Sequence, residues 1–136
     1  MIKNLNIVKT IDDTNNPNNL NNIDPDKLNS VTNGFVENID CICLDEFNIK
    51  DRNNLMVAMT HKLSAKGSIS LKVLNLSLLA NQINKCAITG EKLSTILPDI
   101  QSVWSDQECD DVLSQLNLKV KGKYYDYIYT IYQLEK

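Results

Sequence analysis

The sequence predicts an α/β fold: a three-layer, mostly parallel sheet that ends in a C-terminal antiparallel hairpin. Strand and helix patterns alternate from residue 36 onward, which is typical of parallel sheets covered by helices. The stretch "IDCICLDEF" in this region is apolar on both faces beyond Asp40, as a covered strand requires. The tyrosine-rich ending "YYDYIYTIYQLE" favours antiparallel strands. With 136 residues and 43% hydrophobic content, the chain fits a single domain over residues 1–136.

The first third of the chain combines one strand with a long polar segment. Residues 3–11 alternate apolar and polar side chains, and this pattern predicts a strand. Residues 12–34 form an Asn-rich loop region, because Asn and Asp bond to their own backbone and favour turns. Within it, Asp24 followed by Pro25 predicts a single helical turn with Asp24 as its N-cap.

The middle of the chain alternates strands and helices. A strand ending near Leu44 is expected to place Cys41 and Cys43 on one face. Asp51 is expected to cap a helix that runs to Leu63. That helix would bury one apolar stripe, made of Leu55, Met56, Met59 and Leu63. The segment "SAKGS" should end the helix before a strand with Ile69, Leu71 and Val73 on one face, and a helix over 76–86 should follow.

The last third carries the strongest local signal. Ser105 and Glu108 match the capping box S-x-x-E, and Asn117 suits a left-handed helix end. Gly90 predicts a turn before a short helix that stops at Pro98. Two final strands flank Gly122 and are expected to pair as an antiparallel hairpin.

These elements resemble a known family. "VENIDCICLDEF", a helix ending in "HKL", and "SAKGSISLKVLN" resemble the second half of class I S-adenosylmethionine-dependent methyltransferases. The ending from "SVWSDQECDD" onward is similar to the helix and hairpin that close the sheet of that family in the order 3-2-1-4-5-7-6. The resemblance implies a truncated Rossmann-like methyltransferase fold.

The cofactor half of the family is not matched. Those enzymes hold S-adenosylmethionine on a glycine-rich turn after the first strand, where glycine lets the backbone approach the ligand. The four glycines here are Gly34, Gly67, Gly90 and Gly122, and "TIDDTNNPNN" after the first strand contains none. The sequence also predicts no second strand that ends in an acid suited to ribose. No cofactor is therefore expected, with S-adenosylmethionine as the alternative.

One acidic loop lies where such a fold places ligands. Asp45, Glu46 and Asn48 follow the strand that ends near Leu44, and open α/β sheets bind ligands beyond the carboxyl ends of their strands. These three residues are the candidate pocket residues. The alternative is a solvated loop that leads into the next helix. No residue is assigned a catalytic role.

The four cysteines do not predict a metal site. Cys41 and Cys43 lie on one face of a strand, and a zinc ion would have to recruit Cys86, Cys109 or His61 from distant helices. Core packing is the better interpretation, because a thiol behaves as a small hydrophobe. A metal-binding regulator is the remote alternative.

Composition limits the remaining functions. The net charge is −3 and the basic residues are scattered, so no nucleic-acid surface is predicted. No apolar run is long enough for a membrane span, and no secretory signal is present, so a cytoplasmic protein is expected. The asparagine content is compatible with an AT-rich source such as a phage.

Two functional hypotheses follow from the sequence. The first is a non-catalytic methyltransferase-like domain that acts as a structural or protein-interaction component. Such a domain would use an exposed sheet edge and its tyrosines to form a homo-oligomer or to bind a protein partner. The alternative is a minimal S-adenosylmethionine-dependent methyltransferase, or another nucleotide-binding enzyme, that acts at the carboxyl edge of the sheet.

Overall fold

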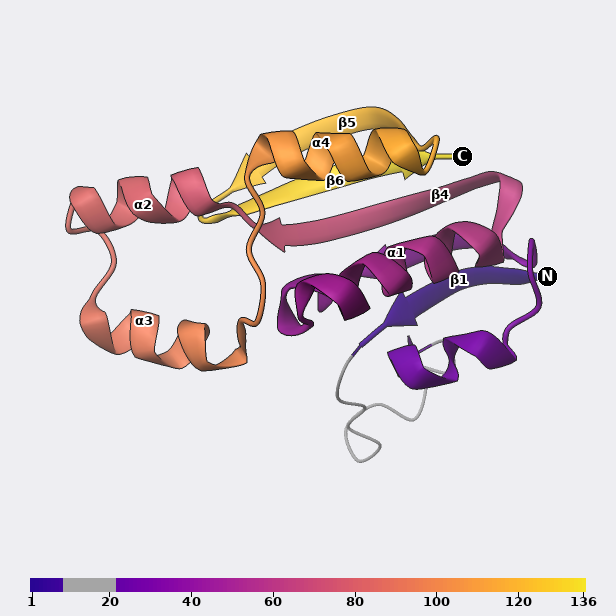
Figure 1. Ribbon diagram of the computed structural model, residues 1–136, viewed down its shortest axis with the longest axis horizontal. Helices are drawn as coiled ribbons and strands as arrows, with labels where there is room; N and C mark the ends of the chain where they lie inside the picture. Colours follow the sequence, from indigo (N-terminus) through magenta and orange to yellow (C-terminus); the bar gives the residue numbers. More distant parts are fainter. Residues whose placement is uncertain (9–21) are drawn as a thin grey trace.

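A six-stranded sheet forms the centre of the protein in a computed structural model that describes residues 1–8 and 22–136 (Figure 1). The strand order is β2-β1-β3-β4-β6-β5. Strands β2, β1, β3 and β4 are parallel, whereas β6 is antiparallel to both of its neighbours. This arrangement confirms the mixed α/β class with a C-terminal antiparallel pair. The strands are β1 (Ile2–Ile7), β2 (Asn22–Ile23), β3 (Val36–Cys41), β4 (Leu63–Leu74), β5 (Lys119–Asp126) and β6 (Tyr129–Glu135).

Helices α1 and α4 lie along one face of this sheet (Figure 1). The α-helices are α1 (Ile49–Lys62), α2 (Leu76–Asn84), α3 (Gly90–Ile96) and α4 (Asp106–Gln115). Short 3₁₀ helices are η1 (Pro25–Ser30), η2 (Leu44–Glu46) and η3 (Leu97–Asp99). Within the described residues, none of these helices is long and apolar enough to cross a membrane.

The main core lies between the sheet and α1, α4 and η1. The predicted helix stripe is confirmed, because Leu55, Met56 and Met59 are buried. They pack in one cluster with the inward side chains of the strands. Those inward side chains are Leu5, Ile7, Val36, Ile39, Cys41, Ile69, Leu71, Val73, Tyr132 and Leu134.

The opposite face of the sheet is polar. Asn38 Nδ2 donates to Asn4 Oδ1 at 3.1 Å, and Ser68 Oγ donates to Asn38 Oδ1 at 2.7 Å. Further along, Gln133 Nε2 donates to Ser70 Oγ at 3.1 Å. These bonds between neighbouring strands satisfy the polar groups without an apolar cover. The described residues thus form two of the three expected layers, the sheet and the helices on one of its faces.

Strand β3 differs from the strand that was predicted. It ends at Cys41, and Leu44 begins η2. The expectation of burial on both faces is wrong, because Asp40 is exposed and Ile42 is 58% exposed. The apolar run is explained by a change of geometry: Ile39 and Cys41 point inward from the strand, and Leu44 is buried by the turn that follows.

The described part of the predicted Asn-rich loop, residues 22–34, contains regular secondary structure. Strand β1 ends at Ile7, and residues 9–11 of the predicted strand and residues 12–21 of the predicted loop lie outside the described residues. The predicted loop region nevertheless contains the short strand β2, which pairs with the end of β1. The helical turn is confirmed: Asp24 Oδ1 accepts a hydrogen bond from the Asp26 N–H at 2.9 Å and caps η1.

The cap of α1 and the start of β4 were also mispredicted. Asn48 is the N-cap, and its Oδ1 accepts a hydrogen bond from the Asp51 N–H at 2.9 Å. The sequence alone does not separate Asn48 from Asp51 here, because Asn and Asp are both preferred at an N-cap. "SAKGS" is not a break, since β4 starts at Leu63 directly after α1. Gly67 allows a close approach there, because an added Cβ would lie 2.8 Å from the Glu37 carbonyl oxygen.

The C-terminal elements confirm the caps and correct the hairpin. Ser105 and Glu108 form the predicted capping box, and Asn117 has a left-handed φ of 57°. The hairpin does not turn at Gly122, which lies inside β5 beside a shift in register. The turn follows Asp126, and Tyr127 adopts a φ of 58° there. Tyr127 therefore lies in the turn between β5 and β6 and not in a strand.

Candidate functional site

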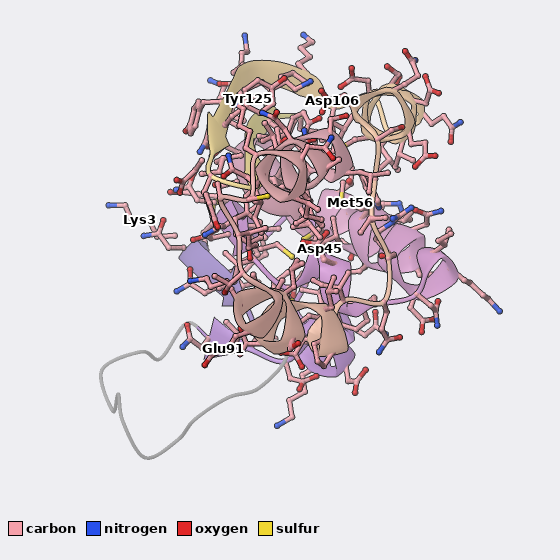
Figure 2. The ribbon with its side chains drawn as sticks, turned by 90° about the vertical axis from the view of Figure 1, so that its left-hand side faces the viewer. Lys3, Asp45, Met56, Glu91, Asp106 and Tyr125 are labelled. Atoms are coloured by element: carbon pink, nitrogen blue, oxygen red, sulfur yellow. The ribbon has the colours of Figure 1, made fainter. Side chains whose placement is uncertain are left out.

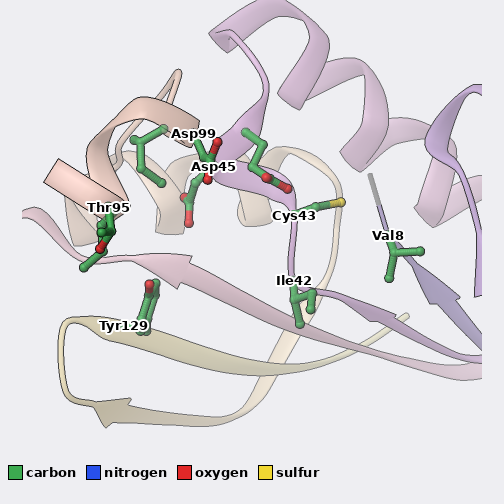
Figure 3. A pocket seen from close by; sticks show the side chains of 10 residues that line it. Val8, Ile42, Cys43, Asp45, Thr95, Asp99 and Tyr129 are labelled. Atoms are coloured by element: carbon green, nitrogen blue, oxygen red, sulfur yellow. The ribbon is translucent and has the colours of Figure 1, made fainter. Parts of the chain in front are cut away.

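A pocket of about 510 Å³ opens at the edge of the sheet where β1 and β3 end. Figure 3 shows the pocket between Thr95 of α3 at one end and Val8, just after β1, at the other. Figure 2 looks onto this end of the molecule, and Asp45 lies near the centre of the view. The described lining residues are Val8, Ile42, Cys43, Asp45, Glu46, Thr95, Ile96, Asp99, Ile100 and Tyr129.

Asp45 is held in place by three backbone N–H groups. Its Oδ2 accepts a hydrogen bond from the Leu74 N–H at 2.8 Å, at the end of β4. Its carbonyl oxygen accepts from the N–H groups of Gln101 and Ser102, at 2.8 and 3.1 Å. The other carboxyl oxygen, Oδ1, is buried and has no hydrogen-bond partner in the described parts of the chain. The site thus contains a fixed carboxyl group with one unused acceptor.

Burial perturbs this carboxyl group strongly. Asp45 is only 4% exposed, and loss of hydration raises its pKa from an ordinary 3.8 to about 6. The Leu74 N–H and the positive charge of Arg52 oppose this increase in pKa, and the charge of Glu46 adds to it. At neutral pH the group is therefore ionised at an energetic cost. A buried carboxylate with an unmet acceptor is typical of a ligand site.

The pocket has an acidic lining. Asp45, Glu46 and Asp99 line it, and its described lining includes no Lys, Arg or His. The buried Arg52 contributes its charge from outside that lining, with its guanidinium 4.0 Å from the centre of the Trp104 ring. Burial lowers the pKa of Arg52. The pocket therefore favours cationic groups over anionic ones.

Helices α2 and α3 form a cap beside the pocket. The chain leaves the sheet at Asn75 and returns at Trp104, and these two residues form an isolated bridge. A second apolar cluster joins the cap to the sheet; its buried members are Leu74, Leu79, Ile88 and Ile128. The cap contributes Thr95, Ile96, Asp99 and Ile100 to the pocket. The sequence predicted a helix over 76–86 and a turn at Gly90, but α2 ends at Asn84 and Gly90 is the first residue of α3.

Two of the three candidate residues lie in the pocket. Asp45 and Glu46 line it, whereas Asn48 caps α1 and is not among the described lining residues. Sequence reasoning missed Asp99 and Tyr129, which come from distant parts of the chain. Nothing in their local sequence identifies them, because only the tertiary fold brings them to this edge.

The structure also places an acid at the end of a second strand, which the sequence analysis had not expected. Strand β2 ends at Ile23, whose carbonyl oxygen accepts a hydrogen bond from the Val8 N–H at 3.1 Å. Asp24 follows immediately, at the carboxyl end of β2 and beside the end of β1. The strand was missed because it has only two residues within an Asn-rich segment.

Cys41, the last residue of β3, and Cys43, just after it, pack in the core. Cys41 is fully buried and Cys43 is 2% exposed, and Cys43 also lines the pocket. Cys43 Sγ lies 3.6 Å from the carbonyl oxygen of Ile7. Cys41 and Cys43 are close enough for each to affect the other, and this contact together with burial raises the pKa of Cys41. In the described ranges, no group of three or more His, Cys, Asp or Glu side chains could hold a metal ion.

Comparison with known proteins identifies the fold. No family model matches the sequence. No curated protein matches it either. An S-adenosylmethionine-dependent methyltransferase from Archaeoglobus fulgidus superposes with a TM-score of 0.70 at 9% identity, over 99% of this chain and 86% of that chain. A possible exported protein from Bordetella parapertussis gives a TM-score of 0.63 at 15% identity, over 84% of this chain.

An O-methyltransferase family protein from Burkholderia thailandensis gives a TM-score of 0.58 at 9% identity, over 83% of this chain. The matched region spans only 42% of the Bordetella chain and 33% of the Burkholderia chain. The observed strand order is the order expected for the family with one edge strand fewer. The chain therefore has the Rossmann-like fold of S-adenosylmethionine-dependent methyltransferases.

Proposed function

We propose that this chain binds S-adenosylmethionine, or a closely related adenosyl ligand, in the pocket at the carboxyl edge of the sheet. The observation that carries the proposal is Asp45, a buried carboxyl group fixed by the Leu74 N–H with its Oδ1 unused. A buried carboxylate oxygen without a hydrogen-bond partner destabilises the folded protein. A bound ligand that donates a hydrogen bond to Oδ1 would remove that cost.

The size and position of the pocket fit this ligand. Small-molecule pockets are typically about 300–1,000 Å³, and this one is about 510 Å³. In open α/β sheets, ligands bind beyond the carboxyl ends of the strands, and an acid about 20 residues after the first strand binds ribose hydroxyls. Asp24 is in that position relative to β1. Val8 and Ile42 would contact the apolar part of the ligand. Asp24 is not among the described lining residues and its Oδ1 caps η1, so its other carboxyl oxygen would bind a ribose that extends beyond Val8.

The charge of the pocket favours this ligand over phosphate-containing nucleotides. Three carboxylates from Asp45, Glu46 and Asp99 would repel a phosphate group. S-adenosylmethionine has no phosphate and carries a positive sulfonium group, which would supply a transferable methyl group to a nucleophile. Asp45 would face that positive charge, and its Oδ1 would accept a hydrogen bond from the bound ligand.

Thermal unfolding with a ligand panel tests the proposal. S-adenosylmethionine and S-adenosylhomocysteine should raise the melting temperature of the full chain, because a ligand at about 100 times its Kd adds about 2.7 kcal/mol. ATP and NAD should have no effect at matched ionic strength. No shift with either adenosyl ligand at millimolar concentration refutes the proposal. An equal shift with ATP refutes the charge argument.

A second candidate is the non-catalytic, partner-binding domain. The sequence favours it because no glycine precedes Gly34, so the glycine-rich cofactor turn of the family is missing. The edge strand β5 exposes Tyr124 and Tyr125, at 49% and 55%. Tyrosine is enriched in protein interfaces, and an unpaired edge strand can accept another strand.

The charges of β5 favour a different, acidic partner over a second copy. Lys119, Lys121 and Lys123 lie along the edge, and two identical strands would bring these lysines together. Sedimentation velocity at high protein concentration tests this point. A monomer is compatible with an acidic partner, whereas a concentration-dependent dimer would favour self-association.

A further inference from the structure

A second groove, of about 280 Å³, lies on the face of the sheet opposite α1 and α4. Figure 1 shows these two helices along the other face. The register of four neighbouring strands places one side chain from each strand side by side in this groove. These side chains, called the polar row below, are Asn6 of β1, Asp40 of β3, Ser70 of β4 and Gln133 of β6.

We propose that the polar row binds a neutral oligosaccharide that lies across the strands. Neighbouring strands are about 4.8 Å apart, so the row spans about 14 Å. That length fits a short chain of sugar rings better than a single ring. Among the described lining residues, this groove shares none with the pocket around Asp45, so the proposal does not depend on an adenosyl ligand.

Asp40 lies at the centre of the row, between Asn6 and Ser70 in register. Its carboxylate has no hydrogen-bond or ion-pair partner in the described parts of the chain. Partial burial by the neighbouring side chains raises the pKa of Asp40. The two oxygens of one carboxylate can accept hydrogen bonds from two adjacent sugar hydroxyls, and such bonds to a charged acceptor are strong.

The other members of the row offer both donors and acceptors. Asn6 Nδ2 donates to Asn22 Oδ1 at 3.1 Å, and Gln133 Nε2 donates to Ser70 Oγ at 3.1 Å. These bonds hold the side chains in place, which lowers the entropy cost of binding a ligand. Within the described residues they leave the Asn6 and Gln133 carbonyl oxygens as acceptors and the Ser70 hydroxyl as a donor. A sugar hydroxyl both donates and accepts, so it suits this mixed row.

An exposed aromatic ring bounds the row at β5. The β5 residue opposite Gln133 is Gly122, and a Cβ added there would lie 3.6 Å from Tyr124 Cε1. The Tyr124 hydroxyl accepts a hydrogen bond from Gln133 Nε2 at 3.0 Å, and the residue is 49% exposed. Tyr124 is outside the described lining of the groove and would contact the last sugar of the chain. The apolar C–H face of a sugar ring packs well on such an aromatic ring.

Other classes of ligand fit this face less well. A protein interface, including one with a second copy, has an apolar core. The polar row and the neighbouring row of Asn4, Asn38 and Ser68 contain no apolar side chain. A nucleic acid would need clustered lysine or arginine, which neither row contains. The charge of Asp40 would also repel an acidic sugar, so a neutral one is favoured.

Side-chain amide signals in ¹H–¹⁵N spectra of the full chain test the proposal. Cellotriose, maltotriose and mannotriose are titrated separately, each beside its monosaccharide. At least one trisaccharide should give saturable shifts of the Asn6 and Gln133 side-chain amides. The Asn75 side-chain amide, which donates to Asp106 and Thr130, is the internal control and should not shift. The corresponding monosaccharide should bind at least tenfold more weakly, because it contacts only part of the row.

Two variants and one matched control test the residues. Asp40→Ala should weaken binding of that trisaccharide about tenfold, and Tyr124→Ala about fivefold. Tyr127→Ala removes another exposed tyrosine, in the turn between β5 and β6, and should leave binding unchanged. Urea unfolding confirms that each variant is folded.

Three outcomes overturn the proposal. The first is the absence of saturable shifts with all three trisaccharides. The second is equal affinity of the natural chain and Asp40→Ala. The third is a change of the Asn6 and Gln133 signals with protein concentration alone, which would assign this face to a second copy of the chain.

Discussion

Replacing Asp45 by Asn should make the protein more stable at neutral pH. The amide oxygen of Asn can still accept the hydrogen bond from the Leu74 N–H, which Asp45 Oδ2 accepts at 2.8 Å. The substitution removes the buried negative charge and changes the side-chain volume very little. Functional residues often cost stability in this way, and neutralising them restores it.

The magnitude follows from the pKa of Asp45. Burial raises this pKa from 3.8 in the unfolded chain to about 6 in the folded protein. A difference of that size corresponds to about 3 kcal/mol, since one pKa unit is about 1.4 kcal/mol. The folded state holds the proton more tightly, so the free energy of unfolding falls as the pH rises from about 4 through about 6. Above about pH 6, Asp45 is ionised in the folded protein and destabilises it by the full amount.

Urea unfolding at several pH values measures this effect. The difference in unfolding free energy between Asp45→Asn and the natural chain should be close to zero at pH 4. It should reach about 3 kcal/mol in favour of the variant at pH 7.5. Glu91→Gln controls for the general loss of a negative charge. A variant that is less stable than the natural chain at pH 7.5, or a difference that does not change with pH, would refute the reasoning.

Two further substitutions test the packing around the site. Asn75→Ala should destabilise the fold by about 2–3 kcal/mol in urea unfolding, because it removes an N-cap and leaves the buried Thr130 hydroxyl without the amide that donates to it at 2.8 Å. A loss under 1 kcal/mol would show that the Asn75 contacts are not needed. Gly67→Ala should cost about 1–3 kcal/mol, because its Cβ would lie 2.6 Å from the Leu63 side chain and 2.8 Å from a backbone oxygen. Gly90→Ala is the matched control, since its Cβ would meet nothing within 4 Å, and thermal unfolding should show it to be neutral or slightly stabilising. Equal effects from the two glycine substitutions would contradict the packing argument.

The sequence predicted features that depend on local chemistry. The capping box at Ser105 requires only residues within one helical turn, and so does the cap at Asp24. The α/β class was also predictable, because strand and helix periodicities differ over short windows. The position of the hairpin turn was not predictable from local sequence. Glycine is common in turns, which favoured Gly122, whereas the turn lies at Tyr127, a residue type that is uncommon there. Pairing with β6 places the turn at Tyr127 despite this preference.

The site was predictable only in part. Asp45 and Glu46 were identified because they follow a recognisable strand, and parallel strands share their carboxyl edge. Asn48 was included through its proximity in sequence, but the first turn of α1 uses its side chain. Asp99 and Tyr129 reach the pocket through the cap and the antiparallel strand, and no pattern within either segment specifies that contact. The polar face of the sheet is similarly a tertiary property, visible only once the register of the strands is known.

Titration calorimetry with S-adenosylmethionine tests the central claim most directly. The natural chain should bind one equivalent. Asp45→Asn should bind at least tenfold more weakly, although it is the more stable protein at pH 7.5. Glu91→Gln should bind like the natural chain. Equal affinity for the natural chain and Asp45→Asn, or no binding by either at millimolar ligand, would contradict the assignment of this pocket.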